Sequence, residues 1–263
     1  MSEYRTIRLA FDEDGLATIT LARPETHNAI SDIFIEEMSE ALEDVANADG
    51  AYALVLEAEG KSFCAGADLE WMKRAASYDR ERNLEDARAL GEMLRRLNFL
   101  TLPTIALVQG PSYGGGVGVV ACCDIVIAAR DAAFTLTEVR LGLLPATISP
   151  YVVAAIGQRA ARRYFMTAER FDAVEAQRLG LVTEVVEAAS DLRPARDRAL
   201  ARFATNAPGA IADSKQLVFD VDRPVDAELI EMTARRIADR RQTEEGREGI
   251  ASFLERRKPR WVR

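Results

Sequence analysis

The sequence is poor in the residues that build metal sites and disulfide frameworks. Its 263 residues include one histidine, His27, and three cysteines, Cys64, Cys122 and Cys123. No cluster of histidine and cysteine has the spacing of metal ligands, so we expect no metal. The cysteines are odd in number, lie in apolar stretches, and include an adjacent pair that is poorly placed to bridge. All three are therefore expected to be reduced core residues.

Positive charge and long apolar runs are also lacking. Lys and Arg number 34 against 42 Asp and Glu, a formal net charge of −8, so a surface that coats nucleic-acid phosphates is not expected. No apolar run reaches the roughly 18 residues of a membrane-spanning helix, and the start MSEYRTIRLA lacks a signal peptide's basic and apolar segments. We expect a soluble, cytoplasmic protein with no nucleic-acid and no membrane partner.

The hydrophobic pattern is typical of an α/β fold. With 48% hydrophobic residues the chain can bury one large core. A helix is expected from Ser31, an N-cap candidate, because apolar residues follow it at helical spacing: Ile33, Phe34, Met38, Ala41, Leu42 and Val45. Strand patterns occur at 5–11, 16–21, 52–58, 104–109 and 124–129, and helical stretches near 191–204, 208–220 and 226–256. Strands separated by helices predict a core over 1–190, followed by a helical region over 191–263.

Two loops carry short side chains directly after predicted strands. Strand 52–58 runs into KSFCAGAD at 61–68, and strand 104–109 runs into QGPSYGGG, with glycines at Gly114, Gly115 and Gly116. Glycine admits turns closed to other residues and lets a ligand approach backbone N–H groups. Each loop can offer one N–H to a single oxygen that gains negative charge. A developing enolate and a phosphate both fit such a site, and a tight structural turn is the alternative.

These segments resemble the enoyl-CoA hydratase/isomerase family, the crotonase superfamily. The resemblance rests on motifs in the family's order along nearly the whole chain: RPETHNAI, KSFCAGADL, PTIALVQGPSYGGG, CDIVIAA, AAFTLTEVRLGLLP and EEGREGIASFLERRKPR. It implies the ClpP-like crotonase fold, in which repeated ββα units form a spiral core with a C-terminal helical region used for trimerisation. It also implies an acyl-CoA substrate, no further cofactor because coenzyme A is part of that substrate, and a homotrimer or a hexamer built from two trimers.

The resemblance assigns roles residue by residue. The backbone N–H groups of Ala67 and Gly115 are the oxyanion hole, and Glu138 is the general acid/base, unless Glu138 instead pairs with Arg140 or another surface cation. The coenzyme A moiety lies near Arg23, His27, Ala29, Ala65 and Asp68, although Asp68 and Glu70 are also expected to cap or solvate the helix that begins there. Phe253 and Arg256 of a neighbouring subunit reach the adenine, unless they are an apolar helix face and a solvated charge.

Position 118 departs from the family pattern. Hydratases of simple enoyl chains carry a second glutamate there, and this sequence has Gly118. Either Glu138 performs both proton transfers or another group, with Glu92 as a candidate, supplies the second. The remaining pattern is similar to hydratases of methylglutaconyl-CoA and isohexenylglutaconyl-type esters, so a branched or glutaconyl-type substrate is expected. An isomerase, a decarboxylase and a catalytically silent acyl-CoA-binding homologue remain alternatives, and a Ser112–His27 nucleophile pair is the remaining hydrolase possibility.

Overall fold

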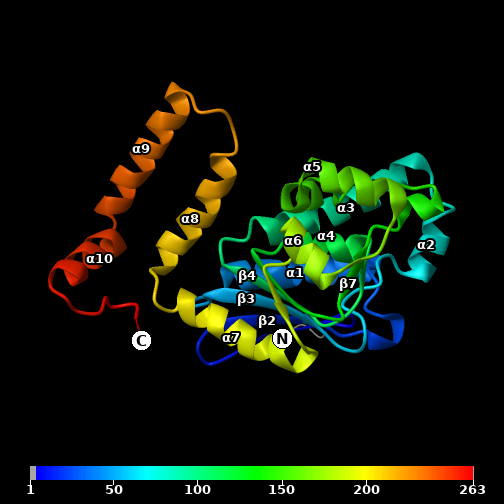
Figure 1. Ribbon diagram of the computed structural model, residues 1–263, viewed down its shortest axis with the longest axis horizontal. Coiled ribbons are helices and arrows are strands. Elements are labelled where there is room, and N and C mark those ends of the chain that lie inside the picture. The colour runs from blue at the N-terminus through cyan, green and yellow to red at the C-terminus, as the bar shows by residue number, and fades with distance from the viewer. Residues whose placement is uncertain (1–3, 263) are drawn as a thin grey trace. The chain divides into compact units, whose positions relative to one another are not determined.

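The computed structural model describes residues 4–262 and divides them into two compact units (Figure 1). One unit runs through Arg196 apart from 101–103, and the other comprises 101–103 and the chain from Asp197 on. The boundary between the units falls at 196/197, six residues beyond the predicted 190/191. Helix α7 (Leu192–Phe203) crosses this boundary. No helix among residues 4–262 has the length and apolar character needed to cross a bilayer.

A six-stranded sheet forms the centre of the first unit. Its strands lie in the order β1-β2-β3-β4-β6-β9, with β1 antiparallel to β2 and every other pair parallel. Their bounds are Ile7–Phe11, Leu16–Leu21, Ala53–Ala58, Thr104–Val108, Ile125–Ala129 and Glu184–Val186. The predicted strands therefore agree with the observed ones within two residues, while β9 was not predicted.

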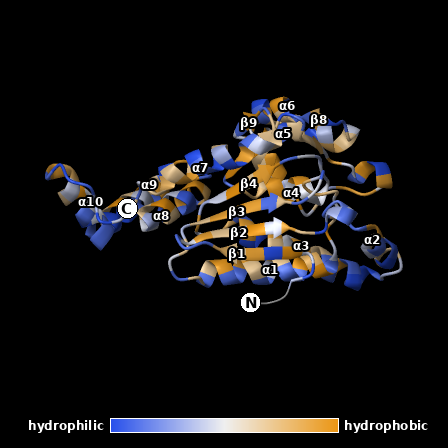
Figure 2. Cartoon of the chain, turned by 90° about the horizontal axis from the view of Figure 1, so that it is seen from below, coloured by the Kyte–Doolittle hydropathy of each residue, from blue (hydrophilic) through white to orange (hydrophobic). Residues whose placement is uncertain are grey.

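The central strands are buried along their length. All five residues of β4 are buried, as are the first four of β3, and both strands appear as a hydrophobic band in Figure 2. Near-continuous apolar runs of this kind are typical of parallel strands covered on both faces. Burial of the sheet fixes the positions at which its loops leave the carboxyl ends of β3 and β4.

A second, three-stranded sheet contains the strand that leads into the glycine triplet. Its strands are β5 (Ser112–Tyr113), β7 (Ala133–Thr135) and β8 (Phe171–Asp172), with β5 parallel to β7 and β7 antiparallel to β8. The N–H of Gly114 donates to the carbonyl of Thr135 at 2.9 Å. The loop before α4 is therefore anchored to the segment that leads into Glu138.

Helices complete the first unit. The two longest in its first half, α1 (Asp32–Asn47) and α3 (Arg80–Asn98), pack against each other. The predicted cap of α1 is confirmed, since the Ser31 hydroxyl accepts from the Phe34 N–H. Ile35 is buried in α1, whereas Ile33 is only half-buried. The remaining helical segments are η1 (Pro24–Thr26), α2 (Leu69–Ala75), α4 (Gly115–Ala121), η2 (Glu138–Leu141), α5 (Ser149–Thr167), α6 (Ala173–Leu179) and η3 (Ala189–Asp191).

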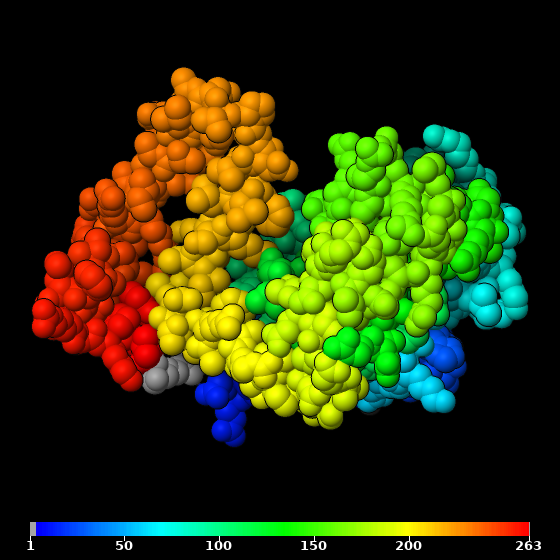
Figure 3. Space-filling view, in the orientation of Figure 1, coloured from blue at the N-terminus to red at the C-terminus, as the bar shows by residue number. Residues whose placement is uncertain are grey.

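The second unit is helical, as predicted for this part of the chain. It contains α8 (Pro208–Asp220), α9 (Ala227–Gln242) and α10 (Glu244–Leu254). The single stretch predicted over 226–256 is divided at Thr243, whose hydroxyl accepts from the Gly246 N–H and caps α10. Helices α8 and α9 stand apart along part of their length (Figure 3) and are linked by long side chains, such as Arg240 to Asp213 at 3.0 Å.

Candidate active site

Three segments distant in sequence meet beside the ends of β3 and β4. Ile30 forms a β-bridge with Ala67, and Cys64 forms one with Ser112. The N–H of Ala65 donates to the His27 carbonyl, and the N–H of Tyr113 donates to the Cys64 carbonyl, both at 2.9 Å. The two glycine-bearing loops singled out in the sequence are thereby held side by side.

Two residues that line one pocket have backbone N–H groups without a hydrogen-bond acceptor among the described residues. Ala67 and Gly115 both line it, and among the described residues neither N–H donates a hydrogen bond. Gly115 is the first residue of α4, where an N–H has no intrahelical partner. Gly114 before it has a φ of 45°, in the left-handed region that favours glycine. This pair of unpaired donors suits an oxygen that gains negative charge.

The pocket has a volume of about 480 Å³ and a mainly apolar wall. One part of the wall comes from the α2–α3 region, with Leu69, Trp71, Met72, Ala75, Ala87 and Leu90. Another part follows η2, with Leu143, Leu144, Pro145, Ala146, Thr147 and Ile148. The described lining residues include the carboxylates of Glu138 and Asp86 and no Lys or Arg. An acyl chain fits such a surface, because apolar contact with few polar groups is what it requires.

Glu138 supplies the pocket's unpaired carboxylate. Its Oε2 has no hydrogen-bond partner among the described residues, and a Cβ added at Gly114 would lie 3.0 Å from its Oε1. Burial raises the pKa of the Glu138 carboxyl above its usual range, which suits an acid/base group. Arg140 forms no ion pair with it among the described residues, and its guanidinium donates instead to the Ala168 carbonyl at 2.6 Å. The alternative reading of Glu138 as a residue paired with Arg140 is therefore wrong.

Ile148 occupies the space beside Gly118. A Cβ added at Gly118 would lie 2.7 Å from the Cβ of Ile148, and closer still to its Cγ2. Ile148 is buried at 3% exposure and lines the pocket. The place where simple hydratases are expected to carry a second glutamate is therefore filled by an apolar wall in this chain.

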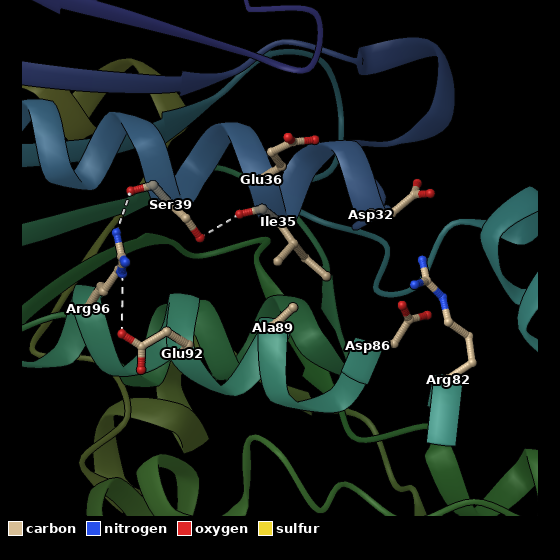
Figure 4. Close-up of a pocket in the computed structure, with 9 residues that line it drawn as sticks. All are labelled: Asp32, Ile35, Glu36, Ser39, Arg82, Asp86, Ala89, Glu92 and Arg96. Carbon is tan, nitrogen blue, oxygen red and sulfur yellow. Dashed lines mark hydrogen bonds and ion pairs between the residues drawn. The ribbon is translucent and has the colours of Figure 1, made fainter. Parts of the chain in front are cut away.

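Glu92 does not supply the missing carboxylate. It lies on α3 and lines a separate cleft between α1 and α3, where Figure 4 shows its contact with Arg96, at 3.3 Å. It also binds Arg95 at 2.8 Å. The hydrogen bond from Arg95 in particular lowers the pKa of Glu92 to about 2. A paired carboxylate that does not line the pocket of Glu138 is unsuited to proton transfer there, so the prediction for Glu92 is wrong.

The sequence matches the family model described as enoyl-CoA hydratase/isomerase over residues 12–263. The chain belongs to this family. The short-chain-enoyl-CoA hydratase of Clostridium acetobutylicum is 32% identical over 94% of each chain. The crystal structure of an enoyl-CoA hydratase from Shewanella pealeana matches with a TM-score of 0.95 and 41% identity, covering 98% of this chain and 97% of that one. The structure of Pseudomonas aeruginosa AtuE matches with a TM-score of 0.94 and 37% identity, covering 98% and 100%.

These matches confirm the predicted crotonase fold and identify the chain as an enzyme of the enoyl-CoA hydratase/isomerase family. The narrower likeness to methylglutaconyl-type hydratases stays a prediction.

Five of the residues expected to bind coenzyme A in this enoyl-CoA hydratase/isomerase lie in two adjoining loops. Arg23, His27 and Ala29 flank η1, and Ala65 lies on the pocket wall next to them. Asp68 caps α2 by accepting from the N–H groups of Glu70 and Trp71, and it accepts from Arg23 at 3.1 Å. Burial alone would raise the pKa of the Asp68 carboxyl, but these hydrogen bonds lower that pKa below its usual range. The predicted cap is confirmed, and contact of these residues with coenzyme A stays a prediction.

Phe253 and Arg256 lie in the second compact unit. Phe253 is 82% exposed near the end of α10, and Arg256 follows that helix with a φ of 56°. Their contact with an adenine in a neighbouring subunit stays a prediction.

The predicted alternative of a Ser112–His27 nucleophile pair is not formed, because His27 is next to a different serine. The Nδ1 of His27 lies 3.1 Å from the Oγ of Ser62, and the Oγ of Ser112 is buried without a hydrogen-bond partner among the described residues. A Ser112–His27 pair is therefore not formed.

Cys64 packs directly against the glycine triplet. Its side chain approaches Gly116 so closely that a Cβ there would lie 2.7 Å from the Cys64 Cβ. Cys64 is fully buried, and this burial raises the pKa of its thiol to about 12. Cys122 is buried as well, whereas Cys123 is half-buried, and none of the three cysteines forms a disulfide among the described residues.

Two residues of the site were not singled out from the sequence. Trp71 and Asp86 both line the pocket and are joined by a hydrogen bond of 3.0 Å from the indole N–H. They are 15 residues apart on different helices. No local pattern in the sequence signals such a contact.

Proposed function

We propose that this chain adds water to an α,β-unsaturated acyl-CoA. The supporting observation is that one apolar pocket contains two unpaired N–H donors, at Ala67 and Gly115, together with the unpaired carboxylate of Glu138, whose pKa is raised. Donors of this kind typically contribute about 10²- to 10³-fold in rate. A positioned acid/base contributes about 10²- to 10⁴-fold. The combination is suited to making and protonating a thioester enolate.

Glu138 serves both proton transfers in this proposal. Its carboxylate takes a proton from water as the oxygen bonds to the β-carbon, and the electron pair of the double bond moves onto the thioester oxygen. The N–H groups of Ala67 and Gly115 stabilise that oxygen. Glu138 then returns the proton to the α-carbon, and the thioester carbonyl re-forms. The apolar wall at Ile148 is the reason that one carboxylate carries both steps.

The substrate we propose is a branched or glutaconyl-type CoA ester. A glutaconyl-type ester carries a carboxymethyl group that can place the water, which offsets the missing glutamate at position 118. Among the described residues, the pocket lining has no Lys or Arg to pair with the carboxylate of such a substrate. It already includes two carboxylates, those of Glu138 and Asp86. Within this class, a branched acyl group without a second charge therefore fits the pocket better. Coenzyme A enters as part of the substrate, and the assembly we propose is a homotrimer or a hexamer.

The single acid/base group also favours a second candidate, an enoyl-CoA isomerase. Moving a double bond requires one proton to leave one carbon and join another, and Glu138 can do both without water. A decarboxylase would likewise manage with one such group. A catalytically silent homologue would bind acyl-CoA esters and turn over none.

A panel of esters tests these functions. Crotonyl-CoA, 3-methylglutaconyl-CoA and a long-chain branched analogue are followed by loss of thioester-conjugation absorbance, with product water incorporation measured by mass spectrometry. We expect faster hydration of the branched esters than of crotonyl-CoA. Crotonyl-CoA hydration at a rate no lower than for any branched ester would refute the substrate argument from Gly118. Conversion of a 3-enoyl-CoA with a gain of absorbance and no added water would identify the isomerase instead.

Glu138→Gln tests the mechanism. We expect kcat to fall by about two or more orders of magnitude while the Kd for a saturated acyl-CoA is nearly unchanged, because only proton transfer is removed. Glu70→Gln is the matched control, since Glu70 is an exposed glutamate that pairs with Lys73 outside the pocket. Equal activity in Glu138→Gln and wild type would end the proposed role.

A further inference from the structure

Helix α2 rests on the acyl pocket and is attached through polar contacts. None of its residues is buried, and Leu69 at its start is 73% exposed. It is attached at its beginning by Asp68, in its middle by the Trp71–Asp86 hydrogen bond, and at its end by Arg74, which donates to both oxygens of Asp32 at 2.9 and 2.8 Å. The middle contact is the one of the three in which both partners line the pocket.

Asp86 separates two cavities. It lines the acyl pocket of about 480 Å³, and it also lines the cleft of about 290 Å³ between α1 and α3. It is the one described residue that the two linings share. Figure 4 shows Asp86 at the end of this cleft, near Arg82 and Asp32. The Trp71 ring lies on the acyl side, where its N–H holds the Asp86 carboxylate at 3.0 Å.

The cleft behind Asp86 is chemically unlike the pocket before it. Its wall carries charged side chains on both helices, with Asp32 and Glu36 from α1 and Arg82, Glu92 and Arg96 from α3. Ile35 and Ala89 lie between these charges and give the cleft wall an apolar surface, on which a tail can lie once the Trp71–Asp86 contact is removed. Each methylene buried against apolar surface tightens binding by about fourfold. The change from apolar to charged surroundings occurs at the Trp71–Asp86 contact.

We propose that the Trp71–Asp86 hydrogen bond is a partition that limits the length of the acyl chain. Trp71 and Asp86 close the α3 side of the pocket, so a tail that reaches them gains no further affinity. Removing the contact joins the pocket to the space of the cleft and admits longer tails. This inference rests on the proposed function in one respect, that the pocket receives an acyl-CoA, and not on the reaction performed there.

Calorimetric titration with butyryl-, octanoyl- and dodecanoyl-CoA tests the partition without turnover. For wild type we expect the affinity to stop rising once the tail reaches Trp71. In Trp71→Ala and Asp86→Ala we expect the affinity for dodecanoyl-CoA to rise by at least about tenfold, with that for butyryl-CoA within about twofold of wild type. Trp71→Phe keeps a ring and loses the N–H, so it should shift the dependence of affinity on tail length in the same direction. It provides a second test if Trp71→Ala fails to fold.

Two further variants are matched controls. Asp86→Asn keeps an acceptor for the Trp71 N–H and should retain the wild-type length profile, as should Glu36→Ala on the cleft wall. A length profile unchanged in Trp71→Ala and Asp86→Ala, or an equal shift in Asp86→Asn and Asp86→Ala, would overturn the partition.

Turnover gives a separate check. A loss of crotonyl-CoA turnover in Asp86→Asn comparable to that of Glu138→Gln would make Asp86 an acid/base group and also overturn the partition. A wild type that binds these esters but converts no enoyl-CoA would refute the proposed function and leave the partition test intact.

Discussion

Glu138 combines partial burial with the absence, among the described residues, of any cation paired to it. Such a carboxyl is more costly to ionise in the folded protein than in the unfolded chain, as its raised pKa records. Below the ordinary glutamate pKa of about 4.3, both states hold the proton and Glu138 costs no stability. As pH rises above that value, the unfolded chain releases its proton first, so folding loses free energy until the raised folded pKa has been passed.

We therefore expect Glu138→Gln to gain stability over wild type as pH rises through this window. The measurement is urea unfolding of both proteins at a series of pH values. If the difference in unfolding free energy between the two proteins does not vary with pH, the pKa of Glu138 is the same in the folded and unfolded states. If Glu138 acts first as a base, kcat/KM of wild type should fall with decreasing pH over the same interval.

Gly115 allows the proposed oxyanion donor to be removed with little change to the helix. It is the first residue of α4, a position that favours proline, so Gly115→Pro deletes the N–H where the helix tolerates it. We expect kcat/KM to fall by about 10²- to 10³-fold. Gly115→Ala is the control, because it keeps the N–H and its Cβ would meet only the terminal methyl of Ile30, at 2.9 Å. Activity retained in a folded Gly115→Pro protein would place the thioester oxygen elsewhere.

At the scale of elements, the packing of α4 against the start of α5 decides what position 118 can hold. Gly118→Glu alone should clash with Ile148, lower the melting temperature and cost about a few kcal/mol, with no gain on crotonyl-CoA. Gly118→Glu combined with Ile148→Ala opens the space, and we expect it to regain part of the stability and to hydrate crotonyl-CoA faster than wild type. Ile148→Ala by itself should only lose stability, by about 2–5 kcal/mol. A gain of crotonyl-CoA activity in the single Gly118→Glu variant would contradict this account of Ile148.

The elements that the sequence predicts are those with a local signal. Strands β1 to β4 and β6 show alternation or continuous apolar runs, and Ser31 with its apolar followers predicts α1. Strands β5 and β8 have two residues each, too few for any period, and exist because they pair with β7 across more than 20 residues of chain. The break at Thr243 escaped prediction because the helical pattern continues through it, while its capping hydrogen bond is visible only in the structure.

The same distinction holds for the site. The loops with Ala67 and Gly115 were predicted from motifs rich in glycine and other residues with short side chains. Glu138 was predicted from the resemblance. The pairs that we propose to limit the substrate range, Ile148 beside Gly118 and Asp86 beside Trp71, are contacts between separate elements. Glu92 was misplaced because its helical position gives no information on which of two cavities its side chain faces.

At the scale of the whole molecule, the second unit exposes apolar side chains that a single chain leaves uncovered. Val225 is 80% exposed, Phe253 82% and Leu254 73%. Burying such surface favours association. We expect light scattering at micromolar concentration to give the mass of three or six chains, and Phe253→Asp to shift that mass toward the monomer, with Lys258→Ala as a control. A monomeric wild type would contradict the proposed assembly.

The burial of Cys64 protects this thiol from reaction with an unsaturated thioester in the pocket. An α,β-unsaturated thioester is an electrophile, and a thiolate adds readily to such a double bond. Cys64 immediately precedes Ala65 on the pocket wall, yet with a pKa of about 12 and no solvent exposure it stays a thiol at neutral pH. The enzyme can therefore hold a Michael acceptor one residue away from sulfur without being alkylated by its own substrate.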